Sequence, residues 1–362
     1  MKKTSRIGYF VFLFIPWIML FSNGEEGAPA DKNRTHSMLP ILMYDSDIGF
    51  GFGGKGVLKN LYQKNESFDL TLFGSTKGEQ WYKFSFSIPD AEIRQNTPFP
   101  IALDVHIEYD KFLKSNFFGI GNDSKDNDNS FPREFINLEL ILSRAFSSRL
   151  VAEFGYYLMV SSVYGYGSAV PVMSPAISGE GETAVGNIRF RMRWDTRNSQ
   201  IHPTKGCQLT FHIDLARKVL AGDYTFNRYH VMMSRYVSIH SSSHILAARF
   251  VTQHIDGTAP FYKLCILGGS DTARGFKALR FMDNASMLAS LEYRFPLVGS
   301  LGGVLFSDAG RVFPSIEKAA ANGWKANWGF GLRYYLPDFV TRMDIGFSEE
   351  GMRLFFNFGQ VF

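Results

Sequence analysis

An arginine at a glycine-rich loop tip and two carboxylates further along the chain are the residues best suited to chemistry. Arg274 ends the segment L-G-G-S-D-T-A-R, and Gly275 and Phe276 follow it. Glu292 stands in S-L-E-Y-R-F-P-L and Asp308 in L-F-S-D-A-G. A guanidinium offers a planar fork of donors and stays protonated, so it can engage two carboxylates at once. This predicts a buried ion pair that fixes a loop; a solvated arginine is the alternative.

Residues suited to catalysis or metal binding do not form a recognisable site. The stretch Gly268-Gly269-Ser270 lacks the final glycine of a nucleophile elbow. No motif ties His106 or His212 to a serine or a carboxylate, and P-loop, zinc and calcium-loop spacings are missing from the sequence. We therefore predict that the protein is not an enzyme and uses no metal and no cofactor.

The N-terminus has the layout of a secretory signal peptide. Basic residues at positions 2, 3 and 6 precede an apolar stretch over residues 9–21, and small residues follow. That stretch is shorter than the roughly twenty residues that a transmembrane helix needs. Cleavage after Gly24 and cleavage after Ala30 both remain open, so the predicted signal peptide is 1–24 or 1–30. An uncleaved anchor is the alternative.

Charge and cysteine content argue against two further classes. Residues 1–24 hold three of the 38 basic residues and none of the 34 acidic ones, so the mature chain is close to neutral. Such a balance does not predict binding to nucleic acid. Cys207 and Cys265 are the only cysteines. An exported chain could oxidise them, but two cysteines make no disulfide framework, and we favour free thiols.

Short strands with alternating polarity must position these residues. In Arg189–Asp195, apolar Phe190, Met192 and Trp194 alternate with charged side chains, and Leu103–Asp110 repeats the pattern. Segments of this kind, separated by Gly, Asn, Asp, Ser and Pro, predict strands and turns. About sixteen strands are expected, near residues 38–45, 48–58, 67–77, 80–90, 100–112, 134–144, 149–163, 183–196, 206–217, 224–236, 243–254, 287–296, 302–312, 325–336, 340–348 and 351–361.

Two closed architectures fit such strands. One is a soluble sandwich with a dry core, and the other is a barrel with lipid outside and polar groups within. The signal peptide, the 15% aromatic content and the charges on one face of each strand favour the barrel. We predict an all-β chain whose residues 38–362 form a single transmembrane antiparallel β-barrel.

The order of R-G-F, E-Y-R-F-P-L and F-S-D-A-G resembles the Omp85 superfamily, also called the bacterial surface antigen D15 or BamA/TamA family. The resemblance is specific over residues 267–362. It implies an inward-folded sixth loop with the tip Arg274, Gly275 and Phe276, held in the lumen by Glu292 and Asp308. Fewer than sixteen residues separate either cleavage site from Pro40, so this would be a barrel-only member without POTRA domains.

The resemblance also bears on the two strands that would meet where the barrel closes. The C-terminal M-R-L-F-F-N-F-G-Q-V-F places Phe356, Phe358 and Phe362 on one face with Met352 and Leu354. This looks like the signal by which the barrel assembly machinery recognises a client, or simply like a last lipid-facing strand. The Gly-rich segment 49–56 either weakens the seam with that strand or accommodates crowded aromatic neighbours.

By resemblance, the protein would assist protein or lipid insertion or translocation at the outer membrane of a Gram-negative-type bacterium. The alternative is a pore-forming or structural barrel without translocase activity. An outer-membrane phospholipase is a distant third. The implied partners are outer-membrane lipids, the barrel assembly machinery, and a protein client or a separate periplasmic protein, with no nucleic acid.

Overall fold

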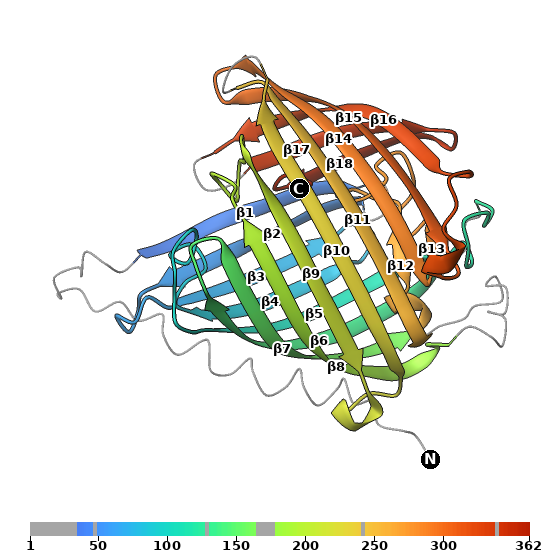
Figure 1. Ribbon diagram of the computed structural model, residues 1–362, viewed down its shortest axis with the longest axis horizontal. Coiled ribbons are helices and arrows are strands. Elements are labelled where there is room, and N and C mark those ends of the chain that lie inside the picture. Colours follow the sequence, from blue (N-terminus) through green and yellow to red (C-terminus); the bar gives the residue numbers. More distant parts are fainter. Residues whose placement is uncertain (1–34, 46–48, 127–129, 164–177, 240–242, 337–339) are drawn as a thin grey trace.

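Segments in which polar and apolar residues alternate form strands with two chemically different faces. The computed structural model describes residues 35–45, 49–126, 130–163, 178–239, 243–336 and 340–362, which leaves the predicted signal peptide outside the described residues (Figure 1). Within these ranges sixteen strands pair into one closed antiparallel barrel, in which β18 returns to β1. The predicted all-β, sixteen-stranded barrel is confirmed.

The barrel strands follow one another around the wall in chain order, except that β11 pairs with β14. Their bounds are β1 Thr35–Asp45, β2 Gly49–Lys59, β3 Ser67–Ser75, β4 Gln80–Ile88, β5 Ala102–Asn116, β6 Ser130–Ala145, β7 Leu150–Val163, β8 Gly181–Asp195, β9 Gly206–Ala216, β10 Thr225–Ser238, β11 Ile245–Thr258, β14 Ala285–Val298, β15 Leu301–Phe313, β16 Lys325–Tyr335, β17 Val340–Ser348 and β18 Gly351–Phe358.

The outer and inner faces of the wall differ as the alternation predicts. On β16 the outward side chains of Trp328, Phe330 and Leu332 are exposed, whereas Asn327 and Arg333 on the inner face are buried. Exposed aromatic and aliphatic side chains on the outside suit a hydrocarbon surrounding. Buried charges inside require partners, and the lumen supplies them.

The Gly-rich segment lies in β2, which pairs with β1 and β3 and does not meet β18. A Cβ added at Gly51 would lie 2.0 Å from Cζ of Phe73, and one at Gly53 would lie 2.1 Å from the carbonyl oxygen of Leu72. Of the two interpretations, a weak seam at these glycines is therefore wrong. The glycines make room for a neighbouring ring and a neighbouring backbone.

The connection between β11 and β14 turns inward, and we call it loop 6 (residues 259–284). It contains a short hairpin, β12 (Cys265–Leu267) and β13 (Phe281–Asp283), that contacts the barrel strands β14 and β15 (Figure 1). This hairpin was not predicted because its strands have three residues each, too few for alternation to be recognised. Cys265 in β12 and Cys207 in β9 are free thiols.

The first barrel strand, β1, begins at the same end of the barrel at which the last strand, β18, ends. We call this end the terminal end. Loop 6 enters from the opposite end. There a cluster of buried apolar side chains joins the base of loop 6 to the wall, with Phe117, Phe131, Phe226, Phe261 and Leu264 among its members. Among the described residues, no helix is long and apolar enough to cross a membrane.

Candidate functional site

Arg274 lies at the tip of loop 6 and is fully buried in the lumen. Its Nε and Nη2 donate to the two carboxylate oxygens of Asp308 at 2.9 and 3.0 Å, and its Nη1 donates to Oε1 of Glu292 at 2.5 Å. The guanidinium carbon also lies 3.6 Å from the centroid of the Phe306 ring. The structure thus brings Arg274 together with both carboxylates that the sequence singled out, through charge-assisted hydrogen bonds.

Neighbours on the barrel wall hold these two carboxylates in turn. Arg294, two residues further along β14, donates from Nε to Oε2 of Glu292 at 2.8 Å. Asn327 on β16 donates from Nδ2 to Oδ2 of Asp308 at 3.0 Å. Each carboxylate therefore has a second donor besides Arg274, so loop 6 docks onto acceptors whose orientation the wall already fixes.

The sequence analysis missed a second ion pair beside the first. Arg333 on β16 donates from Nη1 to Oδ1 of Asp344 on β17 at 2.6 Å, and the other Asp344 oxygen lies 3.7 Å from Nη1 of Arg274. Both side chains stand at inward positions of strands whose alternation is visible in the sequence. Alternation identifies which side chains face the lumen, but it does not tell which of them contact one another from neighbouring strands.

The other two residues of the tip explain the need for the Arg-Gly-Phe order. A Cβ added at Gly275 would lie 2.5 Å from Cβ of Asn327, and Ser348 donates from Oγ to the Gly275 carbonyl at 2.6 Å. Glycine is therefore required because the tip backbone lies directly against the wall. Phe276 is buried and packs edge-to-face on Phe281, with ring centroids 5.3 Å apart.

Ion pairs also hold the two limbs of loop 6 behind the tip. Arg342 forms an ion pair with the side-chain carboxylate of Asp271. The backbone carbonyl oxygen of Asp271 accepts a hydrogen bond from Nη2 of Arg249 at 2.8 Å. On the other limb, Arg280 pairs with Glu350 at 2.7 Å. Loop 6 is therefore fixed to β11 and to β14–β18 over its length and not only at Arg274.

Within the described part of the wall, the shortest strand pairing is the one between its first and last strands. Among the described residues, which leave out 46–48 at the end of β1, β1 and β18 share two residue pairs, Tyr44 with Phe356 and Asp45 with Phe355. By comparison, eleven pairs join β1 to β2 and eight join β17 to β18. The seam between β1 and β18 therefore contributes few of the ladder hydrogen bonds that hold a closed sheet together.

Comparison with known families agrees with this architecture. Residues 60–362 match the Omp85 superfamily domain, which is most of the chain. The chain belongs to the Omp85 superfamily. No curated protein matches the sequence.

Solved structures share the fold of this Omp85 barrel at low sequence identity. BamA from Haemophilus ducreyi lacking POTRA domains 1–3 aligns with a TM-score of 0.65 and 15% identity, over 90% of this chain and 70% of that chain. CdiB from Acinetobacter baumannii aligns at 0.57 and 10% identity, over 90% of this chain and 59% of that one. For CdiB from Escherichia coli the values are 0.62 and 10%, over 91% and 63%. The chain thus spans less than two thirds of either CdiB chain.

The C-terminus of this Omp85 barrel corrects one expectation. β18 ends at Phe358, and Gly359 adopts a left-handed φ of 78° that turns the chain out of the sheet. Phe362 then packs in the lumen near Tyr236 and Ala247. The prediction that Phe362 shares the outer face with Phe356 is therefore wrong. The side chain of Phe358 lies outside the described residues, and the insertion signal itself stays a prediction.

Two lumen arginines hold this inward-turned tail, residues 359–362. Nη1 of Arg249 donates to the Val361 carbonyl at 3.1 Å, and its guanidinium carbon lies 4.7 Å from the centroid of the Phe362 ring. Nη2 of Arg294 donates to the terminal oxygen of Phe362 at 3.0 Å. Because Arg249 also binds loop 6 and Arg294 binds Glu292, the tail belongs to the same network as Arg274.

Proposed function

We propose that this protein assists the insertion or translocation of other proteins, or of lipids, at the outer membrane, and that the seam between β1 and β18 is where it opens. The observation that carries the proposal is that the described part of this seam has two residue pairs, in a wall whose other strand pairs are long. A net contribution of about 0.5–1.5 kcal/mol per hydrogen bond means that separating two residue pairs requires little free energy. The role is one of conformational assistance and not of catalysis.

The network around Arg274 supports this proposal because it holds the strands on the β18 side of the seam in place. Loop 6 is bound to β11 and to β14–β18, so that part of the wall stays rigid when β1 moves. β1 has no such anchor in its pairing with β18. An opening hinged on β1 and β2 would therefore expose the edge of β18 to lipid or to a strand of a client, which can pair with it.

A separate periplasmic protein completes the proposal. The described residues at the terminal end of the barrel are the ends of wall strands and the turns between them. We infer that a partner brings the client to this end. The proposed surroundings are outer-membrane lipids, with the barrel assembly machinery inserting this chain as one of its own clients.

A cysteine cross-link across the seam tests the proposal. Tyr44→Cys with Phe356→Cys, in a background lacking Cys207 and Cys265, places two thiols on directly paired residues, where disulfide geometry is accessible. Leu42→Cys with Phe52→Cys is the matched control between β1 and β2. Oxidising the seam pair should abolish activity in cells and reduction should restore it, while the control pair should leave activity unchanged.

Quantitative proteomics of the outer membrane, with and without the protein, defines that activity. Loss of several barrels would indicate general assembly, and loss of one exported protein would indicate a dedicated translocator. An unchanged profile, or full activity with the seam cross-linked, would contradict the proposal and favour a structural or pore-forming barrel.

A further inference from the structure

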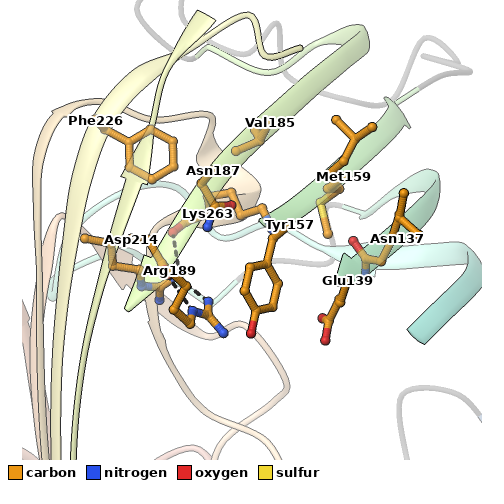
Figure 2. A pocket seen from close by; sticks show the side chains of 13 residues that line it. Asn137, Glu139, Tyr157, Met159, Val185, Asn187, Arg189, Asp214, Phe226 and Lys263 are labelled. Carbon is orange, nitrogen blue, oxygen red and sulfur yellow. Dashed lines mark hydrogen bonds and ion pairs between the residues drawn. The ribbon is translucent and has the colours of Figure 1, made fainter. Parts of the chain in front are cut away.

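A cavity of about 90 Å³ lies in the lumen away from the tip of loop 6, between the base of that loop and the wall formed by β6–β10. This volume is well above the roughly 10–15 Å³ that one water needs. In Figure 2 the side chains of Lys263, Arg189, Asp214 and Tyr157 converge on it. Lys263 belongs to loop 6, in the short 3₁₀ turn Phe261–Lys263, and the other three belong to the wall.

The ammonium of Lys263 has no hydrogen bond or ion pair within the described part of the chain. Its backbone is fixed, because Tyr262 and Leu264 on either side are buried and Nη1 of Arg228 donates to the Lys263 carbonyl at 3.3 Å. The Lys263 side chain is half-buried and lines the cavity. A lysine held in this way is aimed at whatever occupies the cavity.

The charges around this ammonium do not balance. Those that face it are Arg133 and Glu139 on β6, Tyr157 on β7, Arg189 on β8, Asp214 on β9 and Arg228 on β10. Asp214 is already engaged by Arg189 through two hydrogen bonds of 2.5 and 2.9 Å. Arg228 donates to the neutral Gln253 at 2.5 Å, and Arg133 to the neutral Ser161 at 3.2 Å. Glu139, together with Asp110 on β5 near Arg133, is left to offset the three cations Lys263, Arg133 and Arg228.

We propose that this cavity binds a small tetrahedral oxyanion, a phosphate or sulfate group, between Lys263 on loop 6 and Arg228 on the wall, beside the ion pair of Arg189 and Asp214. Cations with no carboxylate to satisfy them favour such an anion strongly in an enclosed site. The apolar cluster at the base of loop 6 covers the cavity on one side, which suits a free inorganic ion and leaves no room for a lipid tail.

The bound anion would fasten the base of loop 6 to β10, on the side of the lumen opposite the Arg274 network. Burial, together with the nearby Arg133 and Arg228, lowers the pKa of Lys263 to about 7. An anion favours the protonated ammonium, so binding takes up a proton near neutral pH. Affinity should therefore be highest below pH 7 and should fall as the pH rises above it.

Calorimetric titration of the barrel in detergent with sodium sulfate, at ionic strength held constant with NaCl, tests the proposal. Sulfate keeps its double charge across this pH range, so any pH dependence reports on the protein. We expect saturable binding that is weaker at pH 8.5 than at pH 6, with a heat that depends on the ionisation enthalpy of the buffer. Lys263→Gln should weaken binding by at least about tenfold, or about 1.4 kcal/mol.

Lys218→Gln is the matched control, because it removes one exposed lysine from the β9–β10 connection. It should bind sulfate like the wild type, and it separates the site from the general stabilisation that sulfate gives all proteins. Equal sulfate binding by Lys263→Gln and wild type would overturn the proposal. So would binding of a phosphatidic acid in the micelle without binding of free sulfate or phosphate. A third contrary outcome is that Glu139→Gln is less stable than wild type while the wild-type barrel binds no sulfate. That result would mean that Glu139 is already the ion-pair partner of Lys263.

Discussion

At the scale of single residues, the lumen shows how a membrane barrel tolerates buried charge. Arg274 has no exposed surface, and neither do Glu292 and Asp308. Taking such ions out of water is unfavourable unless each has a partner and its remaining hydrogen-bonding groups are used. Arg274 meets that condition with charge-assisted donation to two carboxylates, so the loop that carries it is bound in one position.

Arg274→Ala should lower the free energy of unfolding by about 3–5 kcal/mol, because it leaves two buried carboxylates without their cation. Arg274→Lys should recover only part of this loss, since an ammonium cannot form the fork to Asp308 and reach Glu292 together. Urea titration of the refolded barrel, heat-modifiable migration and protease resistance measure the effect. If both variants matched wild type in all three measurements, the Arg274 ion pairs would not be what holds loop 6 in the lumen.

Arg193→Ala is the control for that experiment. Arg193 also faces the lumen, but it is partly exposed and lies 3.9 Å from Glu153. Ion pairs of this kind contribute about 0–1 kcal/mol, so the variant should be close to wild type.

From the sequence, the residues of this site could be predicted only where they stand in short local motifs. Arg274, Glu292 and Asp308 stand in short segments with a recognisable order, and the structure places them in contact. Arg294 was inside one of those segments, yet its bond to Glu292 depends on a rotamer and not on a motif. Arg333 and Asp344 meet through the register of β16 and β17, which alternation alone does not specify.

At the scale of elements, the strands could be predicted from the sequence, but the inward turns of loop 6 and of the C-terminal tail could not. A wall with lipid on one side forces alternation along every strand, and this fixed the number of strands. Loop 6 and the C-terminal tail obey no period, because their contacts are with the lumen. Gly359 was the available signal, since an isolated glycine in a strand pattern often marks a bend.

Phe362→Ala should destabilise the folded barrel by about 1–3 kcal/mol, less than the roughly 3–5 kcal/mol of a fully buried phenylalanine. The reason is that its ring packs near Tyr236 and under Arg249 inside the lumen. Refolding the purified chain in detergent, without assembly machinery, isolates this contribution from recognition during insertion. If the refolded variant were as stable as wild type while insertion in cells failed, Phe362 would act as a signal only.

At the scale of the whole molecule, loop 6 lies inside the wall and contacts its inner face at two places. It contributes the Arg274 network toward β14–β17 and the apolar cluster that meets β6–β11 at its base. A closed sixteen-stranded wall without such a filling would surround a water-filled channel. We therefore predict that loop 6 limits ion conduction through this barrel in its resting state.

Shortening loop 6 tests the role of this filling. Leu267 and Phe281 are paired across the β12–β13 hairpin, so residues 268–280 can be replaced by a tight Asn-Gly turn without displacing the strands that flank them. We expect wild type to give small single-channel conductance in planar bilayers and the shortened variant to give large, stable openings. Replacing the exposed residues 317–323 in the β15–β16 connection should leave conductance small. Equal conductance in all three proteins would mean that the Arg274 network holds loop 6 without closing the lumen, and large conductance already in wild type would favour a pore over a device that opens at its seam.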